Sequence, residues 1–311
     1  MPLQDPFTGK ETFLDGPRLP GAGGQAAILD GHRQRLRAFD QLGEKAEKCG
    51  IRADKDRDLV LVQEDEVGLL ELADPDWAAL GLAIRDFRRW LPIVPFEDFG
   101  FNLDIDDPFE SHTAKLRRIG GGVEALAFID DRRSVYKFFH FREGGDVGAG
   151  FEFTPGGEGG LLQATAVPGS YRMLLEKLRL IHLIGIPTEV VGITPEGILV
   201  AKQTLGQALP EKTDVSGLDP QCLIPLPSRF LRADRDHPRL VFLDGEPWLV
   251  ADTHDRNVVV AEDGSRRIID LVAAPLPREW LAQQSLFRDW IERARLDPHA
   301  DVLAPANDDE L

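Results

Sequence analysis

Apolar side chains recur at steps of three and four residues in two segments of the first hundred residues. The first segment is 28–49, and Gly50 follows it as a natural helix stop. The second follows Asp74-Pro75, a pair typical of an N-cap and first helical residue, and its apolar positions are Trp77, Leu80, Ile84, Phe87 and Leu91. This spacing predicts two amphipathic helices. The run Leu59–Val62 between them reads as a short strand.

From residue 114 onward the pattern changes to short apolar runs separated by turns. Runs at 114–120, 124–130 and 134–140 are separated by Gly120–Gly122 and by Asp130–Arg133, which predicts a β-meander. A helix is expected at 170–184, capped by Ser170 and ended by Gly185, followed by a hairpin of 188–193 and 197–205. The glycine-rich segment 142–160 is expected to be a mobile surface insert. Four further strands are predicted between 239 and 272, and a last helix at 278–295.

Composition narrows the class of protein. The chain has 311 residues, 42% of them apolar, and carries 36 Lys and Arg against 53 Asp and Glu, for a net charge of −17. This acidic excess argues against nucleic acid and anionic membranes as partners. No apolar run approaches membrane-spanning length, no secretory signal pattern is found, and two cysteines are too few for a disulfide framework or a cysteine metal site. We therefore expect a reduced, cytoplasmic protein, with its oligomeric state left open.

The change of pattern predicts three regions. Residues 1–110 form an acidic, mainly helical extension, residues 111–298 a second domain, and residues 299–311 a disordered acidic tail. Arg85, Arg88 and Arg89 in the extension could be a docking patch or simply the solvated face of an amphipathic helix.

The strongest chemical signal lies at residues 252–270. Asp252 precedes Asn257 by five residues, and Asn257 opens the run Val258–Val260, which a turn connects to Ile268-Ile269-Asp270. A hairpin here would bring Asn257 and Asp270 to one open edge, where an amide oxygen beside a carboxylate can hold a hard cation. Asp252 could then orient, or accept a proton from, a hydroxyl group. The alternative is that these are ordinary turn and cap residues.

The pattern Asp252-x-His254-x-x-Asn257, with Asp270 thirteen residues later, resembles the catalytic and metal-binding loops of the protein-kinase-like fold. With a histidine at position 254, the pattern is more similar to that of atypical branches of the fold: aminoglycoside and choline phosphotransferases, phosphoinositide kinases and the kinases of bacterial persistence toxins. The resemblance implies Asp252 as catalytic base and Asn257 and Asp270 as magnesium ligands. It also implies that His254 lies near the transferring phosphate. The alternative is that His254 has only a structural role.

Upstream segments resemble the remaining parts of such a site. Gly120, Gly121 and Gly122 resemble a degraded glycine-rich loop, and Lys137 the lysine that grips the phosphates from the third strand. Glu176 on the predicted helix would be the ion-pair partner of Lys137. Gln203 and Leu205 belong to a fifth strand and hinge, which could hold an adenine edge. The alternatives are turn glycines, a lysine on an edge strand and a solvated glutamate.

The resemblance covers about residues 114–295 and implies an α+β, protein-kinase-like bilobal fold, with an antiparallel β N-lobe, a reduced helical C-lobe and the extra N-terminal helical region. The overall impression is closest to the small kinase domain of polyvalent proteins of phages and conjugative elements. It implies a catalytic phosphotransferase that uses ATP and Mg²⁺ as cofactors and a hydroxyl acceptor on a protein or small molecule.

Several features depart from the family pattern. Val250-Ala251 precede the catalytic Asp252, Asp270 is followed by Leu271-Val272, and no Ala-Pro-Glu signature follows. The 41 residues after Asp270 leave no room for a standard peptide platform. A pseudokinase or nucleotide-binding module without transfer activity is therefore the alternative. A third hypothesis makes residues 1–110 the working part and the kinase-like part its regulator, unless the two helices only pack on the small lobe.

Overall fold

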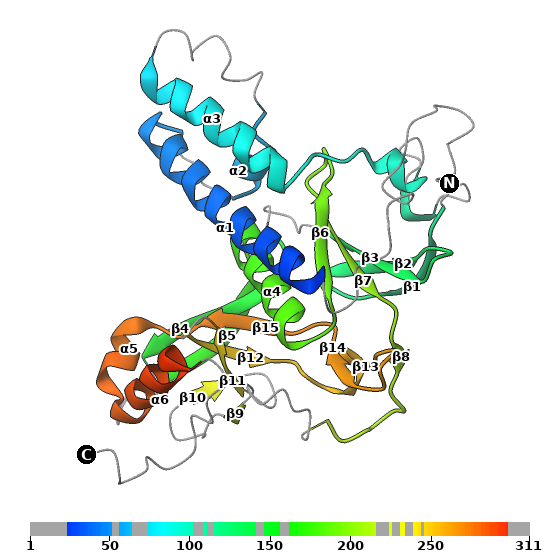
Figure 1. Ribbon diagram of the computed structural model, residues 1–311, viewed down its shortest axis with the longest axis vertical. Coiled ribbons are helices and arrows are strands. Elements are labelled where there is room, and N and C mark those ends of the chain that lie inside the picture. The colour runs from blue at the N-terminus through cyan, green and yellow to red at the C-terminus, as the bar shows by residue number, and fades with distance from the viewer. Residues whose placement is uncertain are drawn as a thin grey trace. The chain divides into compact units, whose positions relative to one another are not determined.

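The computed structural model describes residues 24–51, 56–63, 74–101, 108–110, 115–140, 146–155, 162–215, 224–225, 231–233, 239–243 and 246–297. It is a mixed α+β protein of N-terminal helices and several mainly antiparallel sheets (Figure 1). The chain divides into two compact units. Unit 1 contains Met1–Gly148 and Pro168–Gly206, and unit 2 contains Ala149–Val167 and Gln207–Leu311. This division differs from the predicted boundary near residue 110, while most of the N-terminal arm and the acidic tail lie outside the described residues.

Unit 1 begins with helices α1 (Gln25–Lys48), α2 (Asp56–Leu61) and α3 (Pro75–Trp90). The two predicted amphipathic helices are confirmed, and the Asp74 side chain caps α3 by accepting from the Asp76 amide at 2.8 Å. The predicted strand at 59–62 is wrong, because residues 59–61 lie in α2, where Leu59 and Val60 are buried. Helices α1 and α3 lie side by side (Figure 1).

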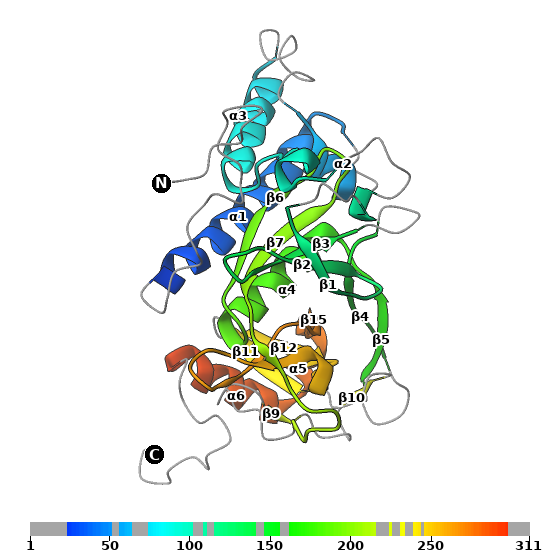
Figure 2. The same ribbon diagram turned by 90° about the vertical axis from the view of Figure 1, so that its right-hand side faces the viewer.

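The main sheet of unit 1 has the order β1-β2-β3-β7-β6, with every neighbouring pair antiparallel. Its strands are β1 (Arg117–Gly121), β2 (Ala125–Ile129), β3 (Ser134–Phe139), β6 (Thr188–Ile193) and β7 (Leu199–Thr204). Helix α4 (Tyr171–Ile184) directly precedes β6 in the chain (Figure 2). The predicted caps Ser170 and Gly185 are confirmed.

The two faces of this sheet have different cores. Leu174, Leu175 and Leu178 of α4 pack on one face with Phe139 and Ala201, and α1 and α3 join the same cluster. On the other face Tyr136 and Phe138 contact an aromatic cluster that includes the short 3₁₀ helices η4 (Phe96–Phe99) and η5 (Pro108–Glu110). Residues 135–139 therefore alternate between two buried environments, as a strand covered on both faces does.

Buried polar contacts tie α1 to this sheet. Arg35 donates from Nε to the Trp90 carbonyl at 2.7 Å and from Nη2 to the Val190 carbonyl at 3.3 Å. His32 Nε2 lies 2.8 Å from the carbonyl oxygen of Thr188. The N-terminal helices thus pack on the sheet and on α4, as one branch of the third hypothesis expected, and they share its core.

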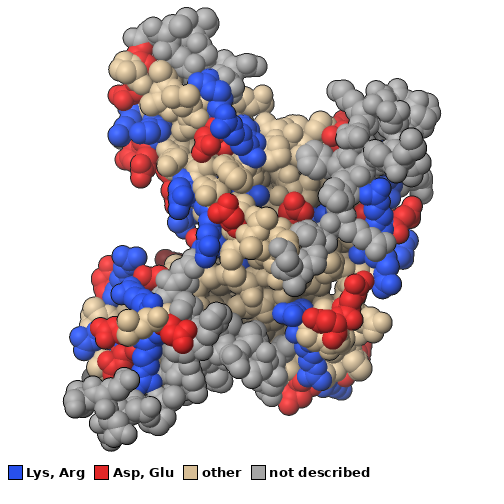
Figure 3. Space-filling view, viewed as in Figure 1, with Lys and Arg blue, Asp and Glu red and all other residues tan. Residues whose placement is uncertain are grey.

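The arginines of α3 do not form a free docking patch as a group. Arg88 donates to the carbonyls of Val60 at 2.7 Å and Val62 at 2.6 Å, so it fastens the end of α2 to α3. On the face drawn in Figure 3, acidic and basic side chains are interspersed over α1 and α3. This mixture of signs is typical of a solvated helix surface.

Unit 2 is built from short strands and two helices. A four-stranded sheet has the order β15-β12-β11-β9, and three-stranded sheets have the orders β14-β13-β8 and β10-β5-β4. The strands are β4 (Ala149–Pro155), β5 (Leu162–Pro168), β8 (Gln207–Ala208), β9 (Ile224–Pro225), β10 (Leu231–Ala233), β11 (Arg239–Leu243), β12 (Glu246–Ala251), β13 (Val258–Val260), β14 (Arg266–Ile268) and β15 (Val272–Pro275). The last predicted helix is divided at Gln284 into α5 (Arg278–Gln283) and α6 (Ser285–Leu296).

The prediction of a mobile insert at 142–160 is wrong over residues 149–155, which form β4. Phe151 is buried and packs with Leu162 of β5, with Leu240 and with Trp280 of α5 in the core of unit 2. The many glycines of this segment concealed the apolar positions that the strand buries. Among the described helices none is both long enough and apolar enough to cross a membrane.

Candidate functional site

The predicted hairpin at 257–270 is confirmed in unit 2. β13 and β14 pair antiparallel, with Val258 opposite Ile268 and Val260 opposite Arg266. The turn closes through two hydrogen bonds, from the Ala261 amide to the Ser265 carbonyl and from the Gly264 amide to the Ala261 carbonyl, and Gly264 has a positive φ of 80°. At the open end the Asn257 carbonyl accepts from the Ile269 amide at 2.8 Å. The register therefore sets Asn257 beside the residue that precedes Asp270.

Asp252 and Asn257 are directly bonded. Asn257 Nδ2 donates to the Asp252 carbonyl oxygen at 2.7 Å and lies 3.3 Å from the Asp252 carboxylate oxygen Oδ2. Asp252 follows the last residue of β12 and has a φ of 64°, in the left-handed region. A non-glycine residue in this region is strained, and Asp is one of the few residues that tolerate it. The chain thus turns sharply at Asp252 and holds its carboxylate near the hairpin.

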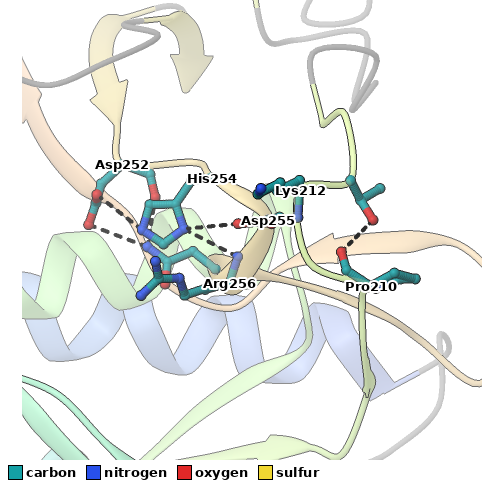
Figure 4. Close-up of polar contacts among 8 residues, drawn as sticks. Pro210, Lys212, Asp252, His254, Asp255 and Arg256 are labelled. Carbon is teal, nitrogen blue, oxygen red and sulfur yellow. Dashed lines mark hydrogen bonds and ion pairs between the residues drawn. The ribbon is translucent and has the colours of Figure 1, made fainter.

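His254 has an assigned orientation within this loop (Figure 4). Its Nδ1 accepts from the Arg256 amide at 3.2 Å, so the neutral ring carries its proton on Nε2. Nε2 lies 3.5 Å from Asp252 Oδ1, and the His254 side chain is 47% exposed. The Asp255 carboxylate accepts from the Lys212 amide at 2.6 Å and so fixes the neighbouring segment 210–213 (Figure 4). The loop is preorganised by its own contacts while His254 stays open to solvent.

Asn257 and Asp270, the predicted Mg²⁺ ligands, carry oxygen atoms of the kind that Mg²⁺ takes. Asp270 Oδ1 accepts from the Leu271 amide at 2.9 Å, which orients the carboxylate at the open end of the hairpin. Because Asn257 Nδ2 is committed to Asp252, its amide oxygen is the atom available as a ligand. Within the described residues no group of three or more His, Cys, Asp and Glu could hold a metal. Mg²⁺ does not need such a cage, since it commonly takes one or two protein oxygens together with water and phosphate, and the residues fit that mode.

Thr253 is a feature of this loop that the sequence did not single out. The residue is 3% exposed, and its hydroxyl has no hydrogen-bond partner within the part of the chain that the structure describes. A buried hydroxyl without a partner is costly, and such groups are concentrated at sites that receive a water or a ligand. A threonine between two candidate site residues was the only available signal, and it was too common a residue to recognise.

The remaining predicted site residues lie in unit 1. Lys137 is in the middle of β3, opposite Ala127 and Ala201, and is 9% exposed. Strand alternation sets it on the same face as Phe139, which is the face that α4 covers. A lysine buried to this extent in an apolar sheet has a specific interaction rather than a solvated ammonium group.

Glu176 pairs with Arg179 of the same helix at 3.0 Å. Burial raises the pKa of Glu176, and the charges of Arg179 and Arg172 oppose this shift. An ion pair between Glu176 and Lys137 stays a prediction. Next to it, Lys177 Nζ lies 2.5 Å from Glu124 Oε2, an ion pair between α4 and the β1–β2 connection that sequence reasoning missed.

The three glycines of the β1–β2 hairpin are not equivalent. A Cβ on Gly121 would come within 2.7 Å of Leu126 Cδ2, so a larger residue there would force the Leu126 side chain to shift. A Cβ on Gly120 or Gly122 would meet nothing within 4 Å, and neither residue has a positive φ. Packing therefore gives a reason for glycine at position 121. Neither packing nor backbone conformation gives one at positions 120 and 122.

The two predicted hinge residues have partners inside unit 1. Gln203 is buried and its Nε2 donates to Thr188 Oγ1 at 3.0 Å. The Leu205 amide donates to the Arg133 carbonyl at 3.2 Å. The segment is thus held in an extended conformation, and contact with an adenine stays a prediction.

Comparison with protein-family models, with curated proteins and with solved structures finds no match for this chain.

Proposed function

We propose that the protein is an ATP- and Mg²⁺-dependent phosphotransferase that moves the γ-phosphate of ATP to a hydroxyl acceptor on a protein or a small molecule. The observation that carries the proposal is the bonded pair Asp252–Asn257, with a hairpin register that sets Asn257 beside Ile269 and Asp270. The Asp252 carboxylate meets both the Asn257 amide and the His254 imidazole, which a turn or cap residue alone does not require.

In this proposal the residues of unit 2 perform the chemistry. Asp252 accepts or orients the proton of the attacking hydroxyl, and the side-chain amide of Asn257 keeps the Asp252 carboxylate in place. Asn257 Oδ1 and Asp270 would hold Mg²⁺, which when bound neutralises phosphate charge. His254, with its proton on Nε2, is a donor near the transferred phosphate.

The residues of unit 1 hold the nucleotide. Lys137, on the third strand of its sheet, binds phosphate oxygens, and the strand that ends near Gln203 and Leu205 is the fifth strand of that sheet in chain order. The open space around Gly120 and Gly122 supports the same role, because it leaves room for a phosphate against the backbone of this connection. These features favour the atypical protein-kinase-like resemblance.

A nucleotide-binding module without transfer activity is the second candidate. Its support is that the carboxylate of Glu176 pairs with Arg179 and that the Leu205 amide is already bonded to Arg133. In the active phosphotransferase that the resemblance implies, Glu176 would pair with Lys137, and the hinge at Leu205 would hold the adenine. Nucleotide binding with no phosphate transfer would favour this candidate.

The test is transfer of the γ-phosphate from labelled ATP in the presence of Mg²⁺, to water, to the chain itself and to a panel of protein and small-molecule hydroxyls. Asp252→Asn and Asp270→Asn should each lower the transfer rate by at least about 100-fold, because each removes a charge that acts at the transferring phosphate. Lys137→Met should weaken ATP binding.

The matched control is Asp263→Asn. Asp263 lies at the turn of the same hairpin, where hydrogen bonds from Ser265 lower its pKa to about 2, and it is remote in register from Asn257. Its replacement should leave transfer unchanged. Equal loss in all three aspartate variants, or full transfer by Asp270→Asn, would overturn the assignment.

A further inference from the structure

The connection between β1 and β2 has little core of its own. Every residue of β1 is exposed, and its partner strand in the sheet is β2. Val123, in the same connection, is 73% exposed. β1 is the edge strand of the five-stranded sheet, whereas β2 also pairs with β3, so the position of β1 and of the connection at 122–124 depends on the contacts that reach them.

One such contact comes from α4. Lys177 lies on the buried side of the helix, beside Leu174 and Leu178, and its side chain is 2% exposed. It reaches Glu124, the last residue before β2, at 2.5 Å. Glu124 is 16% exposed, so both charges of the pair are largely removed from water. The Glu124 carboxylate also lies 3.9 Å from the position of a Cβ on Gly148, and Gly148 has a φ of 69° that favours glycine.

A buried ion pair of this kind is a poor source of stability. Its Coulomb attraction is offset by the desolvation of both ions, and well-packed apolar residues of the same size often serve stability equally well. What the pair does provide is geometric, because a buried ammonium group that donates to the Glu124 carboxylate fixes where that carboxylate lies. This favours a role in fixing the hairpin relative to α4.

We propose that Lys177 and Glu124 are positioning residues that hold the glycine hairpin of residues 117–129 in the place where it binds the phosphates of ATP. The inference rests on the proposed function for its ligand. It assigns to Lys177, and not to its neighbour Glu176, the ionic link between α4 and the nucleotide-binding strands. The pair acts on nucleotide affinity and does not touch the reacting atoms.

The experiment uses the full chain and four variants. Glu124→Gln and Lys177→Met each break the pair. The double variant Glu124→Leu with Lys177→Met replaces both charges by apolar groups, which should keep the fold even if the single variants lose stability. The control is Asp40→Asn, which breaks the exposed ion pair of 2.8 Å between Arg172 of α4 and Asp40 of α1 and leaves the hairpin untouched.

Two readouts are measured: the affinity for MgATP with the split between KM and kcat, and hydrogen exchange of the backbone amides of residues 117–129. We expect Glu124→Gln and the double variant to raise the Kd and KM for MgATP about tenfold with little change in kcat, which corresponds to about 1.4 kcal/mol of binding energy. Exchange should accelerate in the hairpin and stay unchanged in the centre of α4. Asp40→Asn should behave as wild type.

Unchanged affinity in the double variant, or a fall in kcat at constant KM, would overturn the inference. A wild-type chain that binds no MgATP would refute the proposed function and the nucleotide role of the hairpin together. The exchange measurement then still separates the two questions: unaltered protection of 117–129 in Glu124→Gln excludes the pair as the anchor of the hairpin, and lost protection supports it.

Discussion

The polar residues of the two units are used in different ways. In unit 1 the side chains of Arg35, His32 and Gln203 are buried and bond to carbonyl or hydroxyl oxygens, which links α1 to α3 and β6, and β7 to β6. In unit 2 the loop at Asp252–Asn257 is partly exposed, contains a left-handed aspartate and encloses a threonine hydroxyl without a partner among the described residues. Buried and satisfied groups define a shape, whereas strained and open groups point to chemistry.

This difference makes a general prediction about variants. Replacing a polar residue in the unit 1 network should cost stability, because each loss leaves another buried group without its partner. Replacing a residue of the unit 2 loop should cost function with little effect on stability. The following four experiments test the contrast, in order of the expected change in the free energy of unfolding.

Arg35→Met should have the largest effect. It removes the donors to the carbonyls of Trp90 and Val190 in the interior, and we expect the free energy of unfolding to fall by about 3 kcal/mol. Urea denaturation followed by far-UV circular dichroism measures the change. The control Arg172→Ala breaks a half-exposed ion pair and should cost less than about 1 kcal/mol. Equal losses would show that burial of the network does not matter.

Acid should destabilise the chain through His32. Burial, followed by the charge of Arg35, lowers the pKa of His32 from 6.5 to about 3, and the pKa of the neighbouring His182 is lowered by burial as well. The unfolded state therefore binds protons first, so His32 reduces stability as the pH falls from 6.5 towards about 3. Between pH 6.5 and 5 the loss from His32 should be about 2 kcal/mol. Urea denaturation at pH 6.5 and at pH 5 measures the free energy of unfolding, which should fall less between these pH values in His32→Gln than in wild type.

The two kinds of glycine in the hairpin should separate stability from binding. Gly121→Ala forces Leu126 to move and should lower the free energy of unfolding by about 1 kcal/mol. Gly122→Ala meets open space and should leave stability within about 0.5 kcal/mol of wild type while it weakens MgATP binding. Thermal unfolding with and without MgATP measures both effects. Equal responses of the two variants to MgATP would contradict the phosphate role of Gly122.

Asp252→Gly should have the smallest effect on stability and abolish transfer. Glycine adopts the φ of 64° without strain, which offsets the loss of the contact with Asn257. We expect the free energy of unfolding to change by less than about 1 kcal/mol. Activity and denaturation are measured on the same preparation. A large loss of stability would identify Asp252 as a structural residue.

Local signals in the sequence were sufficient for much of the fold and for part of the site. Ser170, Gly185 and Asp74 act through the backbone within a few residues of their own position, so the ends of α4 and the start of α3 could be predicted. The hairpin at Asn257 and Asp270 was predictable for the same reason, because its register is set by a short turn that contains Gly264. Segment 59–62 failed because four apolar residues fit a strand and a buried helix equally well.

By itself, then, the sequence determined the local elements and the pairing of Asp252, Asn257 and Asp270 within one loop and hairpin. Tertiary structure decided which residue of α4 reaches the glycine hairpin, that the N-terminal helices share the core of the main sheet, and that residues 149–155 form a strand. The physical reason is range. Caps and turns are satisfied by neighbours in the chain, whereas the partners of Arg35 and Lys177 lie between 53 and 155 residues away and Phe151 packs with Leu240 and Trp280, where only packing selects them.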